Sequence, residues 1–151
     1  MHIMHISPLK CFEALHFYLT RFFLPDMLAR KSGHIVNVTS PASYVAWPNA
    51  AAYIAARQAL KGFSEALRLE AAASGVFVSL VVLGEVESSY WEHNPGSREH
   101  LPKGLAPLST LEAAESIIRA IERKKKYVIR PALFRLLFTL KALAPGIAFR
   151  G

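Results

Sequence analysis

Three side chains within residues 35–70 could together pass a proton to a carbonyl oxygen. Ser40 follows a run of β-branched residues, Tyr53 stands thirteen residues later, and Arg57 stands four residues after Tyr53. A spacing of four places the phenol and the guanidinium on one face of a helix, one turn apart. A hydroxyl at a strand end that faces this pair could polarise a carbonyl. We therefore take Ser40, Tyr53 and Arg57 as candidate catalytic residues.

The composition predicts a single domain over residues 1–151, because just over half of the residues are hydrophobic and 19% are charged. The net charge of +7 favours phosphate-bearing ligands or an anionic membrane surface. Nucleic acid is not an expected partner, since the basic residues are scattered and form no strip with aromatic residues. The sequence contains no long uncharged apolar run, so it does not predict a membrane-spanning helix.

The cysteine and histidine content predicts neither a disulfide nor a metal site. Cys11 is the single cysteine, so a reducing compartment, the cytoplasm, is the expected location. Residues 1–7 contain two histidines three apart but no helix cap, and we expect them to be disordered.

The first half of the chain alternates helix and strand signals. Residues 8–31 have helical apolar spacing, with a kink or restart expected at Pro25 and a glycine stop at Gly33. Their aromatic residues are expected to form core or a helix–helix interface. Residues 35–39 and 76–83 have the composition of buried parallel strands. The helix between them, residues 51–74, is expected to end at Gly75.

The second half begins with a long loop, residues 84–108, which is expected to form a substrate lid. The residues that favour a lid are Glu85, Glu87, Tyr90 and Trp91. Ser109 and Glu112 form a predicted capping box at the start of the next helix. A third strand is expected at residues 127–129. Residues 132–151 form an amphipathic basic tail that packs on its own domain, on a partner or on a membrane surface.

This order predicts an α/β layer fold with a parallel sheet. Ligands of such sheets bind beyond the carboxyl ends of the strands. Ser40 and Gly84 follow two such ends, so we expect both to face one crevice.

Several segments together resemble the second half of a short-chain dehydrogenase/reductase. The matching segments are Asn37-Val38-Thr39-Ser40, Pro48, Ala52-Tyr53, Ala55-Ala56-Arg57 and Gly84-Glu85-Val86-Glu87-Ser88. The resemblance extends from about residue 12 to residue 131. It implies a partial Rossmann-like doubly wound sheet, a bound NAD or NADP, and a small-molecule carbonyl or alcohol substrate.

The resemblance also implies roles for individual residues. Ser40 would hydrogen-bond the substrate carbonyl, and Tyr53 would be the general acid or base. Tyr53 and Arg57 would also contact the cofactor. The segment with Gly84, Val86 and Ser88 would border the nicotinamide.

The chain departs from the family pattern in five respects. Arg57 stands where the family has lysine, and a planar guanidinium differs from an ammonium in reach and hydration. Leu83 and Ser88 replace a proline and a threonine of the family loop, and no asparagine precedes Asn37. No glycine precedes Gly33, whereas the family's glycine-rich turn binds the pyrophosphate. We therefore expect an N-terminally truncated form that lacks the first half of the fold.

The resemblance implies a pairing surface as well. In the family, the helices that correspond to residues 12–30 and 51–74 pack across a dimer interface. A homo-oligomer, or a complex with a full-length relative, is therefore expected. The alternative to an active oxidoreductase is a catalytically silent interaction module. Peripheral membrane contact through the basic tail is compatible with either.

Overall fold

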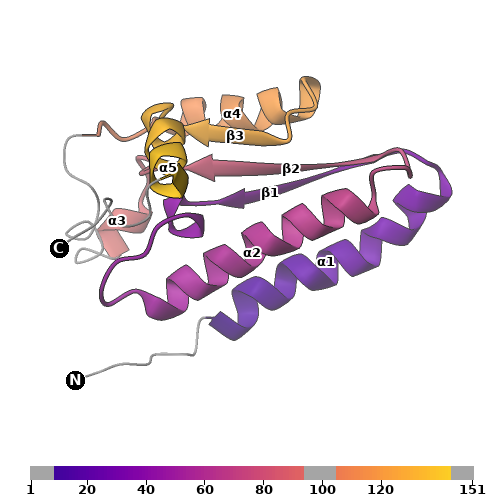
Figure 1. Ribbon diagram of the computed structural model, residues 1–151, viewed down its shortest axis with the longest axis horizontal. Coiled ribbons are helices and arrows are strands. Elements are labelled where there is room, and N and C mark those ends of the chain that lie inside the picture. Colours follow the sequence, from indigo (N-terminus) through magenta and orange to yellow (C-terminus); the bar gives the residue numbers. More distant parts are fainter. Residues whose placement is uncertain (1–8, 94–104, 144–151) are drawn as a thin grey trace.

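The computed structural model describes residues 9–93 and 105–143 (Figure 1). The expectation for residues 1–7, and parts of those for the lid at 84–108 and the tail at 132–151, lie outside this range. In chain order the elements are α1 (Leu9–Ala29), β1 (Gly33–Thr39), α2 (Ala51–Glu70), β2 (Val76–Leu83), α3 (Tyr90–His93), α4 (Thr110–Glu122), β3 (Tyr127–Arg130) and α5 (Leu133–Leu143).

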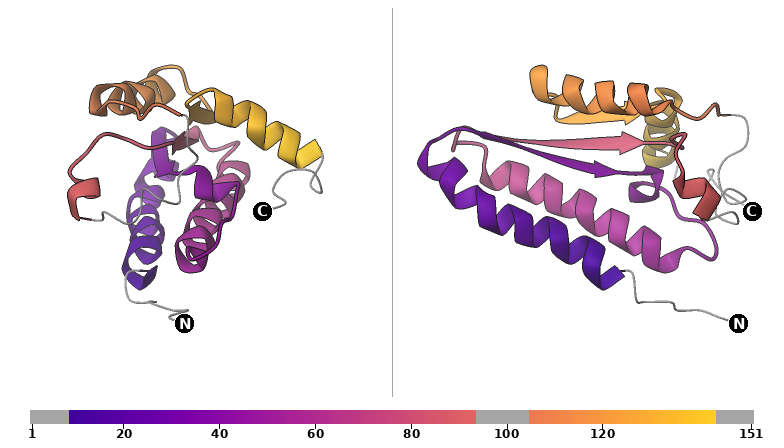
Figure 2. Two further views of the ribbon diagram at one scale, coloured as in Figure 1. Left: turned by 90° about the vertical axis from the view of Figure 1, so that its left-hand side faces the viewer. Right: turned by 180° about the vertical axis from the view of Figure 1, so that it is seen from behind.

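The three strands form a parallel sheet in the order β1-β2-β3, so the predicted parallel α/β fold is confirmed. Helices α1 and α2 lie on one side of the sheet and α4 on the other (Figures 1 and 2). The central strand β2 is therefore buried on both faces, as its continuous apolar run requires. Because the strands are parallel, their carboxyl ends meet at one edge, where α5 also lies.

Helix α1 differs from its prediction in two ways. It runs from Leu9 to Ala29 through Pro25, so of the kink or restart predicted there, the restart is wrong. Proline removes the hydrogen bond to the carbonyl four residues earlier, and the other backbone bonds of the helix continue on both sides of it. The turn after the helix places Lys31, not Gly33, at a positive φ of 52°. Gly33 instead begins β1.

The aromatic residues of α1 were expected to form core or a helix–helix interface, and the structure shows an interface with α2 and not core. Phe17 contacts Phe63 of α2, with ring centroids 4.3 Å apart. However, Tyr18 and Phe22 are 68% and 75% exposed. The helix therefore buries one apolar face on α2 and presents a second one to its surroundings.

Helix α2 is shorter than predicted, because it ends at Glu70 rather than at residue 74. Residues 71–75 form a turn in which Gly75 has a φ of 80°. A Cβ on Gly75 would collide with the backbone carbonyl of Lys31. The glycine is thus needed for the turn and for its close approach to the end of α1.

Residues 84–108 contain more regular structure than the predicted loop. They include the short helix α3 and an isolated β-bridge between Val86 and Leu108. The predicted capping box is confirmed, since Ser109 Oγ accepts from the Glu112 N–H and the Glu112 carboxylate accepts from the Ser109 N–H. The Glu112 carboxylate accepts from both the N–H and the hydroxyl of Ser109, and these two bonds hold the pKa of Glu112 below its usual value. None of the described helices is long and apolar enough to cross a membrane.

Candidate active site

Ser40 stands at the carboxyl end of β1. It caps the short 3₁₀ helix Pro41–Ser43, and its Oγ accepts a hydrogen bond of 3.3 Å from the Ala42 N–H. The β-branched strand thus ends in a tight turn that fixes this hydroxyl at the edge of the sheet.

A buried hydrogen-bond chain ties this turn to α2. Ser43 Oγ donates to the backbone carbonyl of Arg57 at 3.0 Å, and it also bonds Thr39 Oγ1 at 2.6 Å. Because the hydrogen of Ser43 goes to Arg57, Thr39 is the donor in the second bond. The chain joins the end of β1 to the helix that carries the tyrosine.

Tyr53 lies in the first turn of α2 and donates its phenolic hydrogen to Ser40 Oγ at 2.8 Å. That oxygen also accepts from the Ala42 N–H, so the Ser40 hydroxyl still has its own hydrogen to donate. The structure therefore brings together the two hydroxyls that the sequence singled out. A carbonyl oxygen placed beside them could accept the hydrogen of Ser40, and also that of Tyr53 once the phenolic hydrogen turns from Ser40 to the carbonyl.

Arg57 follows one turn after Tyr53, as its spacing predicts. Its Cζ lies 4.9 Å from the centroid of the Tyr53 ring, within the range of a cation–π contact. Trp47 is a further neighbour of the ring, with centroids 6.4 Å apart. The phenol thus has both a cation and an indole near it.

Tyr44 is a second tyrosine near the site, but its environment suits a structural role. Its ring stacks on Phe138 at 4.4 Å between centroids, and burial raises the pKa of Tyr44 to about 12. A phenol with so high a pKa stays protonated at neutral pH and is a poor general base.

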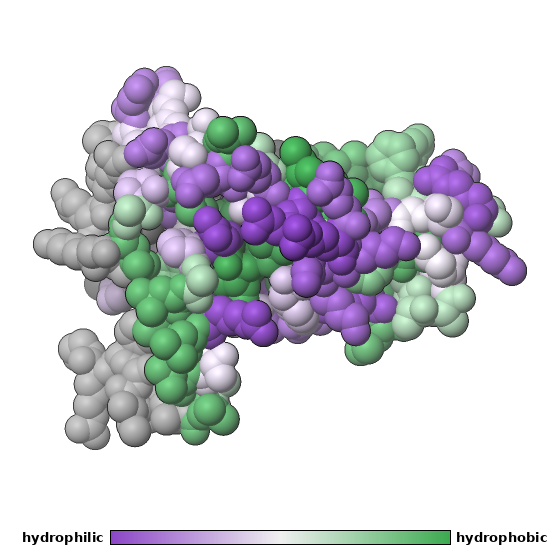
Figure 3. Space-filling model, turned by 90° about the horizontal axis from the view of Figure 1, so that it is seen from above, coloured by the Kyte–Doolittle hydropathy of each residue, from purple (hydrophilic) through white to green (hydrophobic). Residues whose placement is uncertain are grey.

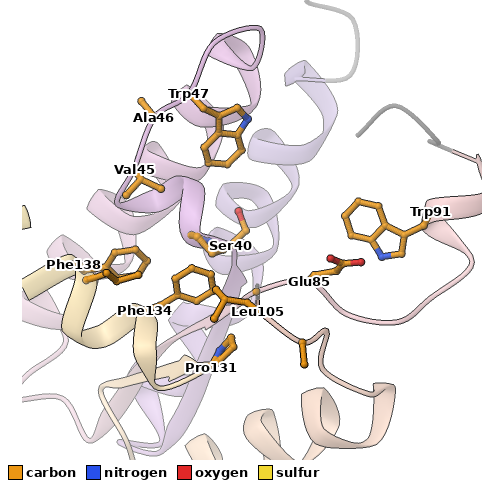
Figure 4. Close-up of a pocket in the computed structure, with 14 residues that line it drawn as sticks. Ser40, Val45, Ala46, Trp47, Glu85, Trp91, Leu105, Pro131, Phe134 and Phe138 are labelled. Carbon is orange, nitrogen blue, oxygen red and sulfur yellow. The ribbon is translucent and has the colours of Figure 1, made fainter. Parts of the chain in front are cut away.

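A cavity of about 460 Å³ opens in front of Ser40 (Figure 4). It is lined by Ser40, Pro41, Val45, Ala46, Trp47, Gly84, Glu85, Trp91, Leu105, Ala106, Pro131, Phe134, Leu137 and Phe138. Most of these side chains are apolar, four of them are aromatic, and Glu85 is the one that carries a charge among the described lining residues. Ser40 and Gly84 line the same cavity, which confirms the predicted shared crevice.

The wall formed by α5 was not predicted. Phe134 and Phe138 are one turn apart, are both buried, and contact Leu80 and Val82 of the central strand. Their spacing of four was a visible signal that one face of the tail packs inward. The sequence did not show that these two rings also form a wall of the cavity.

Gly84 is held at the carboxyl end of β2 and has little room around it. Its N–H donates to the Arg130 carbonyl at 2.8 Å. A Cβ there would come within 2.9 Å of Phe134 Cε2 and 3.0 Å of Pro131 Cδ. Glycine therefore lets α5 approach the strand end closely.

Val86 and Ser88 lie beyond Gly84 and do not line the cavity. Val86 pairs with Leu108, and its carbonyl accepts a bond of 2.7 Å from Trp91 Nε1. Ser88 is exposed. Val86 thus anchors the backbone that carries Glu85 and Trp91 into the cavity.

Within residues 9–93 and 105–143, no three His, Cys, Asp or Glu side chains are grouped so that they could hold a metal ion.

The arrangement defines a class of site in a parallel α/β sheet. A serine at a strand end lines an apolar cavity and is hydrogen-bonded to a tyrosine on the following helix, one turn before a cation. Comparison with known proteins gives the same class. A family model described as short chain dehydrogenase matches residues 14–98, more than half of the chain. This chain belongs to the short-chain dehydrogenase/reductase family.

Individual relatives agree with this assignment. A dehydrogenase/reductase SDR family protein 7-like of Anopheles gambiae is 32% identical over 139 residues, which are 87% of this chain and 43% of the relative. An 11-beta-hydroxysteroid dehydrogenase A of Sesamum indicum is 31% identical over 140 residues, 86% of this chain and 40% of the relative. The chain therefore spans about two fifths of the length of these relatives.

A solved structure shows the same fold. It is a short chain dehydrogenase from Burkholderia cenocepacia in complex with NADP, which is 22% identical. It superposes with a TM-score of 0.71 over 91% of this chain and 56% of that one.

Proposed function

We propose that this chain carries the substrate cavity and the proton-transferring residues of an NAD(P)-dependent oxidoreductase that interconverts a carbonyl and an alcohol. The observation that carries the proposal is the 2.8 Å hydrogen bond from Tyr53 to Ser40 at the edge of an apolar cavity. A catalytically silent module has no need of such a pair, so we do not favour that alternative.

In the proposed reaction, Ser40 and Tyr53 hold the substrate oxygen. During reduction Tyr53 gives its proton to that oxygen, and during oxidation it takes the proton back. Arg57 supplies a positive charge beside the Tyr53 ring, with its Cζ 4.9 Å from the ring centroid, and opposite charges attract, so it would favour the phenolate that forms when the proton leaves. Ser40 keeps the oxygen within reach of the phenol.

The residues at the strand ends suit the nicotinamide end of NAD or NADP. Arg57 is a partly buried cation beside the phenol, and the ends of β1 and β2 frame the region in which ligands of parallel sheets bind. Tyr53, Arg57 and the segment of Gly84, Val86 and Ser88 would hold it. When bound, the cofactor supplies or accepts the hydride.

The cavity favours an apolar substrate with a ring-sized body. Trp47, Trp91, Phe134 and Phe138 offer aromatic surface for such a body, and Ser40 offers one polar contact for its oxygen. The relative from Sesamum indicum is named an 11-beta-hydroxysteroid dehydrogenase, and a hydroxysteroid is an apolar substrate with a ring-sized body.

Tryptophan fluorescence tests the proposed cavity directly, because the chain has two tryptophans and both line it. We expect an apolar aromatic ketone to quench their emission with saturation, and pyruvate to cause no change. Trp47→Phe and Trp91→Phe should each remove part of the signal.

A parallel titration with NADPH should show saturable binding. The affinity should fall by about tenfold in Arg57→Met, which is the cost of losing one charged hydrogen bond. Arg21→Met on the exposed side of α1 is the control. A folded chain that shows no saturation with either ligand contradicts the proposal.

We also propose that the chain pairs with a second copy or a longer relative through α1 and α2. The support is a row of apolar side chains that is exposed on α1, although another face of α1 packs on α2. Light scattering after size exclusion should give a mass above that of the monomer, and Phe22→Ser should shift it toward the monomer. Leu111→Ser, an equally apolar and exposed change on α4, should leave the mass unchanged. A wild-type chain that is monomeric alone and also in a mixture with a full-length relative contradicts this interface.

A further inference from the structure

The cavity holds a carboxylate that the proposed reaction does not use. Among the described side chains that line it, two carry a polar group other than an indole: Ser40 and Glu85. In the proposed reaction Ser40 bonds the reacting oxygen, whereas Glu85 has no part. The surroundings are apolar, and Figure 3 shows the hydrophobic surface of α5, which forms one wall of the cavity, standing out from the body of the molecule. A carboxylate is costly to place in such surroundings unless it is hydrogen-bonded.

The backbone on both sides of Glu85 is held by hydrogen bonds. On one side the Gly84 N–H donates to the Arg130 carbonyl at 2.8 Å. On the other side the Glu85 carbonyl accepts from the Leu108 N–H, and the Glu87 N–H donates to the Leu108 carbonyl, both at 2.8 Å. The half-buried carboxylate is therefore attached to a fixed part of the cavity wall.

The neighbours of Glu85 leave it as the polar group on its side of the cavity. Figure 4 shows Glu85 and Trp91 on one side of Ser40, and the rings of α5 on the other. The Trp91 Nε1–H is already used, because it donates to the Val86 carbonyl at 2.7 Å. A ring-sized ligand that contacts both Ser40 and Trp91 would bring one of its substituents near the carboxylate.

We propose that Glu85 determines substrate specificity by accepting a hydrogen bond from a donor group, a hydroxyl or an ammonium, on the ring body of the carbonyl substrate. Glu85 can act in this way only if the cavity is the substrate site, so the assignment rests on the proposed function. An ionised carboxylate can accept about four hydrogen bonds, so it can bond a ligand as well as the protein. A site with such an acceptor rejects an analogue that lacks the donor, because its polar group is then left unpaired.

Isothermal titration calorimetry of the full chain with matched ketones tests this role. The ligands are the hydroxy-1-tetralones, one for each free position of the aromatic ring, and the methyl and methoxy compounds of the same positions. Their sizes are close, but only the hydroxyl can donate a hydrogen bond. At one position or more, we expect the hydroxy ketone to bind about tenfold more tightly than both counterparts, the value of one hydrogen bond to a charged acceptor.

Variants of two glutamates in the same segment assign the preference. Glu85→Leu should weaken binding of the hydroxy ketone by about tenfold and should bind the methyl ketone as tightly as the wild type or more tightly. Glu87→Leu is the matched control, because Glu87 is exposed and does not line the cavity, and it should keep the wild-type preference. Circular dichroism checks the fold of both variants.

Glu85→Gln distinguishes the two kinds of donor. Its amide oxygen still accepts from a hydroxyl, so the hydroxy ketone should lose no more than about threefold in affinity. An aminomethyl-1-tetralone, which carries an ammonium, should lose about tenfold or more, since the opposite charge is gone.

The outcomes separate this role from the proposed function. Equal affinities of the wild type for the donor-bearing ketones and their methyl counterparts overturn the role of Glu85 alone, because ketone binding still supports the cavity as the substrate site. A preference that Glu85→Leu retains also overturns it, since another group then accepts the hydrogen bond. If no ketone binds to the folded wild type, the role of Glu85 and the proposed function both fail.

Discussion

Tyr53→Phe is expected to lower the rate of carbonyl reduction by about 10²–10⁴-fold, the usual contribution of a positioned general acid. Phenylalanine keeps the ring that contacts Arg57 and Trp47, but it has no proton to give. It also removes the hydrogen bond that Ser40 Oγ receives at 2.8 Å. We expect the loss to appear in kcat with little change in KM, because the proton moves only in the transition state.

Two further variants make this result specific to the pair. Tyr18→Phe removes a phenol that is 68% exposed on α1 and should keep the wild-type rate. Ser40→Ala should lose rate on its own, and the double variant should lose much less than the product of the two single losses, because residues that act as a unit are not additive. A Tyr53→Phe enzyme with full kcat would show that another group supplies the proton.

The strands and the capping box were predicted from local signals. The β-branched apolar runs around Ile35 and Val78 are typical of strands in a buried sheet. The side chains of Ser109 and Glu112 hydrogen-bond the backbone of each other's residue at the start of the helix. Such interactions depend on neighbours in the sequence, which is why they can be read without a structure.

The serine–tyrosine pair was predicted from residue types and spacing, as a hydroxyl at a strand end facing a helix that carries Tyr53 and Arg57. Topology predicted a different pairing, that of Ser40 with Gly84 in one crevice at the carboxyl ends of the strands. The structure adds the bond itself and the chain from Thr39 through Ser43 that fixes it. These bonds depend on where a turn closes, which residue types alone do not determine.

The incorrect predictions concern places where tertiary contacts determine the local structure or its exposure. Gly75 was expected to end α2, but the helix stops at Glu70 and the glycine serves a contact with the end of α1. The turn after α1 uses Lys31 at a positive φ where glycine was expected. The aromatic residues of α1 have core-like spacing yet are largely exposed, since spacing shows a face but not what covers it.

Phe134→Ala is expected to lower the free energy of unfolding by about 3–5 kcal/mol, the usual cost of removing a buried phenylalanine ring. Phe134 is only 5% exposed, and its ring centroid lies 5.6 Å from that of Phe138. The ring also fills the space in front of Gly84, where no side chain of the strand can replace it. Its removal therefore leaves a hole between α5 and the central strand.

The neighbouring residue supplies a matched control in urea denaturation followed by circular dichroism. Leu133→Ala changes the same helix, but its side chain is 46% exposed, and we expect a change of no more than about 0.5 kcal/mol. Without urea, Phe134→Ala should also bind the aromatic ketone more weakly, because the ring is part of the cavity wall. Equal unfolding free energies for the two variants would mean that α5 is not packed on the sheet. The cavity would then lose one wall, and its assignment as the substrate site would have to be withdrawn.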